Sequence, residues 1–257
     1  MPARDLDLLE ETAREAGEIA RSFWREDPQV WDKGGDDPVS EADFAVDAHL
    51  KDRLLAARPD YGWVSEETED DLARLGASRV FIVDPIDGTR SFVAGDKTWA
   101  HSIAVAEEGR VIAACVFLPV REKMYLAEAD GGANLNGTAI TAEQRPALDG
   151  ATVLSPKVSF RPEFWRDGPP DVKRHFRPSL AYRLALVGEG RFDAMITLRP
   201  AWEWDIAAGA LIAEEAGARV MDRHGAPLTF NSPARQTAGV ITGGRVVAEE
   251  LLSKLKR

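Results

Sequence analysis

The sequence feature that most constrains the fold is an apolar run that ends in two acidic residues. Residues 79–83 (RVFIV) have the pattern of a short buried strand, and Asp84 and Asp87 follow it three positions apart. Pro85 fixes one backbone dihedral angle, and Gly88 permits a conformation that is closed to other residues. We therefore predict a tight turn at the end of a buried strand, with two carboxylates held close together.

Two carboxylates in one turn repel each other unless a cation lies between them, and hard cations such as Mg²⁺ prefer carboxylate oxygens as ligands. The backbone N–H groups of Gly88 and Thr89 follow at the start of a helical turn, where they are candidates for binding a phosphate. Taken alone, the spacing of the two aspartates favours a strand-to-helix turn without any ligand. Further carboxylates elsewhere in the chain are needed before this segment predicts a metal site.

Three other acidic segments have simple structural explanations of their own. The adjacent Glu66 and Glu67 are typical of a solvated surface, because they lead into a further acidic run. Ser40 and Asp43 have the S-x-x-D spacing of a capping box at the start of a helix. Asp205 lies next to an apolar helical pattern and is explained equally well as the cap of that helix. These separate explanations do not account for all the segments occurring in one chain.

Composition narrows the class of protein further. The 257 residues suit one large domain or two tightly joined halves. The formal net charge of −11 argues against nucleic-acid polymers as partners, since their binding needs a basic surface. An acidic protein can bind a small phosphorylated metabolite only if local cations outweigh its carboxylates, and bound metal ions are the simplest such cations.

Neither a membrane span nor a signal peptide is expected. No apolar run approaches the roughly 18–20 residues that a membrane-spanning helix needs, and the N-terminal segment has no basic stretch followed by an apolar one. Cys115 is the only cysteine and lies in an apolar, strand-like run, so we expect a buried and unreactive thiol. These features predict a cytoplasmic protein that does not bind membranes.

Hydrophobic periodicity predicts helices and strands in mixed order. The expected helices span residues 5–24, 40–57, 180–187, 206–216 and 246–254. The expected strands span residues 79–83, 102–106, 111–117, 123–127, 151–155, 192–198, 219–221 and 240–242, with a turn at 134–137. In the second helix we expect Phe44, Leu50 and Leu54 on the inner face. This mixture indicates an α/β (α+β) fold of layered sheets and helices, in which residues 167–178 are a candidate lid or junction.

The acidic segments and Lys33, taken in order, resemble one family. Lys33, DPVSEAD (37–43), SEE (65–67), DPIDGT (84–89) and WDIAAG (204–209) are similar to the inositol monophosphatase superfamily of metal-dependent, lithium-sensitive phosphatases. The resemblance implies a layered αβαβα sandwich of the inositol monophosphatase and fructose-1,6-bisphosphatase type. It also implies a homodimer, and two halves within one compact unit: residues 1–145 with most of the metal ligands, and residues 146–257 with Asp205 and the specificity residues.

The resemblance assigns five residues to metal ions. Glu66, Asp84 and the carbonyl oxygen of Ile86 would hold one Mg²⁺, and Asp84, Asp87 and Asp205 would hold a second. Asp84 then bridges two ions roughly 3.5–4 Å apart, the arrangement of two-metal hydrolysis. The resemblance leaves open whether a third ion binds.

Other residues are implied to act on water and on the substrate. Glu67 and Thr89 would position the attacking water, and Ser40 and Asp43 would orient that network. Ser40 stands where the family usually has threonine and keeps the hydroxyl group. Gly88 and Thr89 would bind the substrate phosphate. Asp205, Arg183 and Lys33 are further candidates for binding the substrate, and Lys33 would lie near a weaker metal or water site.

Positions expected to set specificity depart from the inositol-specific pattern. Leu198, seven positions before Asp205, stands where inositol-specific members have a glutamate that contacts sugar hydroxyls. Residues 193–209 look similar to the 3′(2′),5′-bisphosphate nucleotidases of the bacterial CysQ type, and Arg183 falls where those enzymes carry a lysine. A cation at this position implies binding of a second phosphate. A surface helix arginine explains Arg183 equally well.

Several substrate classes follow from these residues. Residues 131–140 and 225–233 look more like inositol and sugar-phosphate members of the family. The sequence predicts a bisphosphate nucleotidase first, an inositol-1-monophosphatase second and a histidinol-phosphatase third. An inactive metal-binding scaffold is the non-enzyme alternative, and the complete set of predicted ligands argues against it. Neither a G-x-x-x-x-G-K-[ST] P-loop nor a G-x-S-x-G hydrolase motif occurs.

Overall fold

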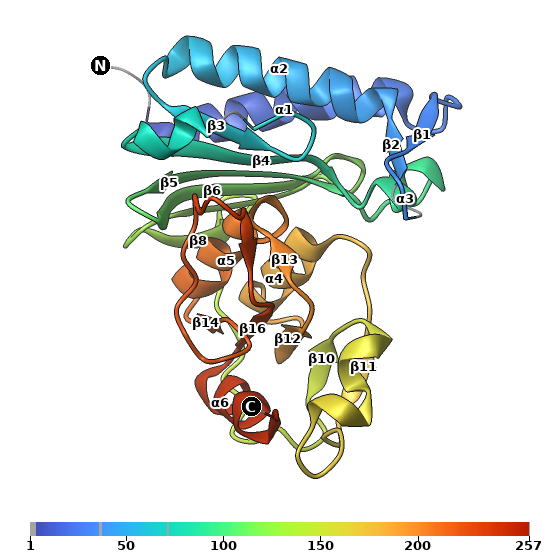
Figure 1. The fold of residues 1–257 in the computed structure, drawn as a ribbon, viewed down its shortest axis with the longest axis vertical. Coiled ribbons are helices and arrows are strands. Elements are labelled where there is room, and N and C mark those ends of the chain that lie inside the picture. Colours follow the sequence, from blue (N-terminus) through green and yellow to red (C-terminus); the bar gives the residue numbers. More distant parts are fainter. Residues whose placement is uncertain (1–3, 36–37, 71, 257) are drawn as a thin grey trace.

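Helices and sheets alternate in five layers in the structure, a computed structural model that describes residues 4–35, 38–70 and 72–256 (Figure 1). The first layer is α1 (Asp5–Phe23) and α2 (Glu41–Ala57), the third is α4 (Leu180–Gly188) and α5 (Glu203–Glu215), and the fifth is α6 (Arg245–Lys254). A seven-stranded sheet and a five-stranded sheet lie between them. The predicted αβαβα sandwich is confirmed.

The large sheet has its strands in the order β3-β4-β5-β6-β7-β8-β9. Its strands are β3 (Gly62–Ser65), β4 (Arg79–Asp87), β5 (Ala100–Glu107), β6 (Arg110–Leu118), β7 (Lys123–Glu128), β8 (Gly132–Leu135) and β9 (Thr138–Ala139). β3 pairs with β4 in parallel, and all later neighbours pair antiparallel. This meander agrees with the predicted strands. The predicted buried thiol is also confirmed, because Cys115 is fully buried on β6 and burial raises its pKa.

The smaller sheet has the order β11-β10-β12-β16-β14. Its strands are β10 (Thr152–Leu154), β11 (Lys173–His175), β12 (Ala194–Thr197), β14 (Arg219–Met221) and β16 (Val240–Gly243). The remaining short elements are β1 (Val30–Asp32), β2 (Pro38–Ser40), β13 (Ala201–Trp202), β15 (Gln236–Thr237), α3 (Thr89–Val93) and the 3₁₀ turns 73–76, 119–121, 157–160 and 162–164. The predicted lid or junction at 167–178 contains the edge strand β11. The division at residue 145 stays a prediction.

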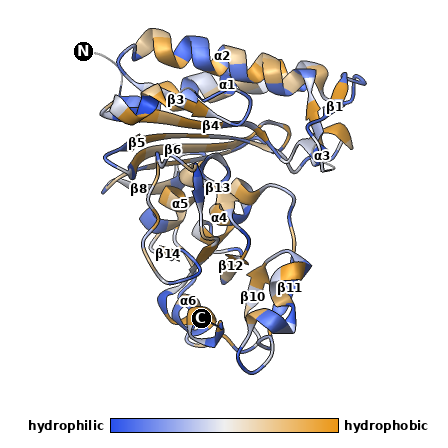
Figure 2. Ribbon diagram, in the orientation of Figure 1, coloured by the Kyte–Doolittle hydropathy of each residue, from blue (hydrophilic) through white to orange (hydrophobic). Residues whose placement is uncertain are grey.

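Three apolar cores hold the layers together, and Figure 2 shows the large sheet as a mostly hydrophobic layer between helices. One core joins α1 and α2 to the large sheet, a second joins both sheets through α4 and α5, and a third lies between the small sheet and α6. α5 is apolar on nearly all sides, as expected of a helix that is covered all round. A Cβ atom at Gly209 would lie 2.6 Å from Leu184, so this glycine allows α4 and α5 to pack closely.

One predicted core residue of α2 is wrong. Leu50 and Leu54 are fully buried, but Phe44 is 45% exposed and its ring lies against Trp31. The buried stripe of α2 runs through Val46, Leu50 and Leu54 at steps of four. Phe44 lies two positions before this stripe, about 200° around the helix, and therefore faces away from the sheet.

The predicted turn after residue 83 is also corrected. β4 continues to Asp87 through a β-bulge, in which Pro85 and Ile86 lie opposite His101 alone on β5. The His101 ring is fully buried, and its Nδ1 hydrogen-bonds to the Pro85 carbonyl oxygen. The chain turns only at Gly88, whose φ of +100° requires glycine, and α3 follows. The bulge directs Asp84 and Asp87 toward the same side, which the sequence pattern did not reveal.

No helix of the described part of the chain has the length and apolar character that crossing a bilayer requires.

Candidate metal and phosphate site

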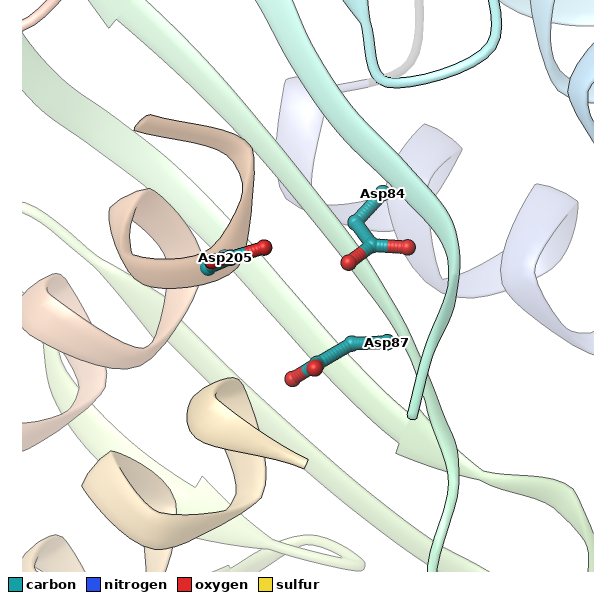
Figure 3. A group of neighbouring side chains, drawn as sticks. All are labelled: Asp84, Asp87 and Asp205. Atoms are coloured by element: carbon teal, nitrogen blue, oxygen red, sulfur yellow. The ribbon is translucent and has the colours of Figure 1, made fainter. Parts of the chain in front are cut away.

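Three aspartates from distant parts of the chain meet at one end of the large sheet. Asp84 and Asp87 extend from the bulge of β4, and Asp205 extends from the first turn of α5 (Figure 3). Each offers a carboxylate oxygen, and these atoms all lie within 4.8 Å of one another. The side chains point toward a common centre, so the structure brings together the three residues predicted to hold the second metal ion.

This cluster is electrostatically unfavourable by itself. Burial raises the pKa of Asp84 well above its usual value, and the charges of Glu66, Asp87 and Asp205 raise it further. Burial and the charge of Asp87 also raise the pKa of Asp205. The Oδ1 atom of Asp84 is buried without a hydrogen-bond partner. A carboxylate set of this kind fits a hard divalent cation, which would remove the repulsion and supply the missing partner.

Asp87 is held in place by the start of α4. It accepts hydrogen bonds from Ser179 Oγ (2.6 Å) and from the backbone N–H groups of Leu180 (3.1 Å) and Ala181 (2.6 Å). Burial nevertheless raises the pKa of Asp87. Sequence reasoning missed Ser179, although a serine directly before an apolar helical pattern is a common N-cap.

Asp205, in contrast, does not cap its helix. α5 begins at Glu203 with Trp202 as the preceding residue, so Asp205 lies within the first turn. The carboxylate of Glu203 turns away instead and accepts hydrogen bonds from the backbone N–H groups of Asn231 (2.6 Å) and Ser232 (3.0 Å). The simple structural explanation considered for Asp205 is therefore wrong, and its carboxylate is available to the cluster.

Lys33 bridges the two glutamates that follow β3. Its Nζ donates to Glu66 Oε1 (3.0 Å) and to Glu67 Oε1 (2.6 Å). Burial lowers the pKa of Lys33, but the two carboxylates more than offset this and the net shift is upward. Burial raises the pKa of Glu67 to about 7, while the hydrogen bond from Lys33 opposes this shift. Glu66 and Glu67 are thus not solvated surface residues, contrary to the simple explanation of their pairing.

A hydroxyl–carboxylate network lies beside the cluster. Ser40 Oγ donates to Asp43 Oδ2 (2.6 Å), and Thr89 Oγ1 contacts both Asp43 Oδ1 (3.0 Å) and the Ile86 carbonyl oxygen (3.1 Å). Burial raises the pKa of Asp43 to about 6, and the hydrogen bonds from Ser40 and Thr89 oppose this. Ser40 and Asp43 therefore form the predicted capping box of α2, and the same two residues reach Thr89 in the predicted orienting network. Asp37, at the start of the DPVSEAD segment, lies outside the described residues.

A cavity of about 710 Å³ opens onto the cluster. Its lining combines carboxylates, the phosphate-binding candidates, arginines and aromatic rings: Gly34, Gly35, Pro38, Glu66, Asp84, Ile86, Asp87, Gly88, Thr89, Arg90, Ser91, Asp96, Phe176, Pro178, Leu180, Arg183, Arg199, Pro200, Trp202 and Asp205. The full predicted ligand set therefore faces one cavity, although Glu66 is not part of the group within 4.8 Å. Such a site can hold cations and a small anionic ligand together.

Comparison with known proteins identifies the family. A family model described as the inositol monophosphatase family matches residues 3–257. The chain belongs to the inositol monophosphatase family. It is 32% identical to an inositol-1-monophosphatase of Rhizobium meliloti (strain 1021), over 98% of this chain and 96% of that protein. It is 30% identical to Nus factor SuhB of Escherichia coli (strain K12), over 98% of this chain and 95% of that protein.

Solved structures of this family have the same fold. An inositol monophosphatase of Thermotoga maritima is similar with a TM-score of 0.82 and 28% identity, over 96% of this chain and 95% of that chain. The extragenic suppressor protein suhB of Bartonella henselae gives a TM-score of 0.81 and 26% identity, over 96% of both chains. Inositol monophosphatases are metal-dependent phosphoric monoester hydrolases, and the acidic cluster lies in the cavity where such a metal would act.

In this inositol monophosphatase family member, the structure places two residues that were expected to set specificity, Arg183 and Leu198, in buried positions. Arg183 is only 5% exposed and lines the cavity, so the surface helix arginine is wrong. Leu198 is 2% exposed and packs in the core beneath α6, while its neighbour Arg199 lines the cavity. Sequence reasoning missed Arg199 and Trp202, although both lie in the stretch compared with the nucleotidases.

Proposed function

We propose that this protein is a Mg²⁺-dependent phosphomonoesterase that hydrolyses inositol 1-phosphate or a closely related small phosphate monoester. The observation that carries the proposal is the cluster of the buried Asp84 and Asp87 with the partly buried Asp205, which faces a cavity. Among the described residues, no lysine or arginine forms an ion pair within 4.0 Å of these three carboxylates. A relative that covers nearly the whole chain is named an inositol-1-monophosphatase, which supports the substrate class.

The residues present fit two metal ions. Asp84, Asp87 and Asp205 would hold one, and Asp84, Glu66 and the Ile86 carbonyl oxygen would hold the other. Bound Mg²⁺ would supply a lowered pKa for water and a positive charge against the phosphoryl oxygens.

The chain's own groups orient the attacking water and the phosphate. Asp43 accepts the hydroxyl hydrogens of Ser40 and Thr89, which fixes the Thr89 side chain and leaves its oxygen free to accept from a water molecule. Glu67 lies next to Glu66, and we propose that Glu67 and Thr89 together orient the attacking water. Gly88 and Thr89 line the cavity where the phosphate would bind, and the positive φ of Gly88 keeps side-chain bulk out of this place.

Lys33 has two roles in this proposal. In the structure its ammonium group forms ion pairs with both Glu66 and Glu67. With Mg²⁺ at Glu66, the ammonium group would lie at the edge of the site, where it can contact a weaker cation site or the substrate phosphate. The number of bound Mg²⁺ ions, two or three, therefore depends on the competition between Lys33 and a further cation for Glu66 and Glu67.

The names of the relatives favour the second sequence-based substrate over the first. The relatives described above are called inositol-1-monophosphatase and Nus factor SuhB, and neither name indicates a bisphosphate nucleotidase. The nucleotidase and the histidinol-phosphatase stay predictions. So do a homodimer and a cytoplasmic location. An inactive scaffold is not expected, because the predicted ligands all face one cavity.

Phosphate release from three compounds tests the proposal. Inositol 1-phosphate, 3′-phosphoadenosine 5′-phosphate and histidinol phosphate are compared with Mg²⁺ and with a chelator. We expect Mg²⁺-dependent release that is fastest from inositol 1-phosphate. Faster release from either other compound would keep the reaction type and replace the substrate. Activity that persists in chelator would refute the metal-dependent reaction.

A further inference from the structure

A buried arginine in the cavity wall lacks part of its hydrogen bonding. The Arg183 side chain extends from α4 and is 5% exposed. One terminal nitrogen, Nη2, donates to the Pro178 carbonyl oxygen (3.1 Å), and the guanidinium group lies 4.9 Å from the centre of the Phe176 ring. Its Nε is buried without a partner. A buried N–H on a charged group is costly to leave unpaired, so a ligand oxygen is the expected partner.

A second arginine lines the same cavity. Arg199 is exposed, and no hydrogen bond or ion pair joins its guanidinium group to another residue of the described chain. The two arginines repel each other: burial lowers the pKa of Arg183 to about 10, and the charge of Arg199 adds to this. Two cations that share one wall, one of them incompletely bonded, are the arrangement that binds an anion.

Neutralisation of the aspartate cluster is the simplest competing explanation. Arg183 attracts Asp87, and both arginines attract Asp205, at longer range. No ion pair within 4.0 Å joins them to the aspartates among the described residues. Asp87 already accepts three hydrogen bonds from the start of α4. Divalent cations at the cluster would also remove most of its attraction for the arginines. The two guanidinium groups would then face the cavity as a separate positive site.

We propose that Arg183 and Arg199 bind a second anionic group of the substrate, a carboxylate or a phosphate, on the part of the molecule that leaves as the alcohol. The inference rests on the proposed phosphomonoesterase activity and specifies the substrate class of the same site. This is a binding role, distinct from that of the carboxylates that hold the metal ions.

Aromatic rings border this anion site. Trp202 is 38% exposed, lines the cavity and stacks on Trp204 at 4.7 Å with an angle of 7° between the rings. Arg235 lies 5.8 Å from both ring centres and helps to fix the stack. Phe176, which is 48% exposed, forms a second flat surface beneath Arg183. A leaving group with a compact ring and one anionic substituent, such as an inositol ring with a second phosphate, is the chemistry that matches these contacts.

Matched pairs of substrates test the inference. Glycerol 2-phosphate and 2-phosphoglycerate differ by one carboxylate, and inositol 1-phosphate and inositol 1,4-bisphosphate differ by one phosphate. We expect kcat/KM to be at least tenfold higher for the member of one pair that carries the second anionic group, and the pair that shows it identifies the group. Arg199→Ala should reduce that preference at least fivefold, chiefly through KM. Arg183→Gln should act in the same direction.

Arg219→Ala is the matched control, because Arg219 is exposed on β14 and does not line the cavity. Equal kcat/KM within both pairs, or equal effects of Arg199→Ala and Arg219→Ala, would overturn the inference while leaving the phosphomonoesterase intact. If no compound releases phosphate, the proposed function fails, and equilibrium binding of the same pairs decides the anion site. Tighter binding of the second-anion member that is lost in Arg199→Ala supports the site; equal binding overturns it.

Discussion

The protein contains two clusters with largely buried carboxylates, and only in the second is the carboxylate paired with an arginine. In the first, Asp84, Asp87 and Asp205 face one another. Burial raises the pKa of all three, and neighbouring carboxylates raise the pKa of Asp84 and Asp205 further. In the second, Asp70 is 5% exposed but accepts hydrogen bonds from Arg74 Nε (3.1 Å) and Nη2 (2.8 Å), which lower its pKa.

The second cluster also secures the loop before β15. Arg74 contacts the Asn231 side chain and donates to the Ser232 carbonyl oxygen (3.0 Å), and Glu203 binds the same loop from α5. Every charge in this cluster has a partner within the chain. Burial of a carboxylate therefore does not mark a functional site by itself; burial without an internal cation does.

The largest expected effect is the loss of catalytic activity in Asp205→Asn. Removing one ligand of the metal cluster should lower kcat/KM by about 10²–10³-fold, because the loss of metal charge is worth several kcal/mol in the transition state. The fold should be retained, since the neutral amide relieves repulsion. Phosphate release and thermal unfolding of the purified variant measure both effects, and wild-type activity would show that Asp205 holds no catalytic metal.

Arg74→Met should give the opposite pattern. It removes the two charge-assisted hydrogen bonds that Asp70 accepts and leaves Arg235 Nε, 3.6 Å from Asp70 Oδ2, as the remaining cation. Losing hydrogen bonds to a charged group costs about 1.5–3 kcal/mol of stability. Activity per folded molecule should change less than about threefold, because Arg74 lies outside the cavity lining. Urea unfolding measures the stability, and kcat measured below the unfolding transition gives the activity per folded molecule. A loss of activity without loss of stability would break the comparison.

Ser179→Ala should affect both stability and metal binding. The hydroxyl donates to Asp87 and caps α4 through the Tyr182 N–H, and losing such a cap costs about 1 kcal/mol. Groups that orient a metal ligand affect metal affinity by about 10–100-fold. A Mg²⁺ titration of activity should show a higher half-saturating concentration. An unchanged Mg²⁺ dependence would mean that Asp87 needs no support from α4.

The smallest effect concerns acid stability. The pKa of Asp70 is lowered in the folded state by its hydrogen bonds to Arg74, so its contribution to stability is present above its unfolded pKa of about 3.9. That contribution is lost as the pH falls through the folded pKa. Asp70→Asn should therefore lower stability by about 1–2 kcal/mol at neutral pH and flatten the fall in stability below about pH 4. Parallel pH curves for the two proteins would contradict this.

The sequence was a good guide to the elements and to the metal ligands. Local patterns suffice for α1, α2 and the β5–β6 hairpin, because each depends on the period of its own residues. The three aspartates were recognised through motifs whose order resembles a known family. Exposure of Phe44 could also have been predicted, since its place on the helix relative to Leu50 and Leu54 follows from the period of the helix.

What the sequence did not reveal depends on contacts between distant segments. The extension of β4 to Asp87 arises from pairing with β5, and the fixation of Asp87 arises from α4, more than ninety residues away. Arg183 is buried because the segment before α4 folds over it. Where the chain leaves β12, the Leu198 side chain packs into the core and Arg199 lines the cavity. The direction of the chain at this point cannot be predicted from the local sequence pattern.

Calorimetric titration of Mg²⁺ into the wild-type protein, Asp205→Asn and Asp70→Asn tests the central claim most directly. Both variants remove one carboxylate charge, but only Asp205 belongs to the cluster that has no ion pair within the described residues. We predict that the wild-type protein and Asp70→Asn bind Mg²⁺ alike and that Asp205→Asn binds it at least tenfold more weakly. Equal binding by the wild-type protein and Asp205→Asn would contradict the assignment of the metal site.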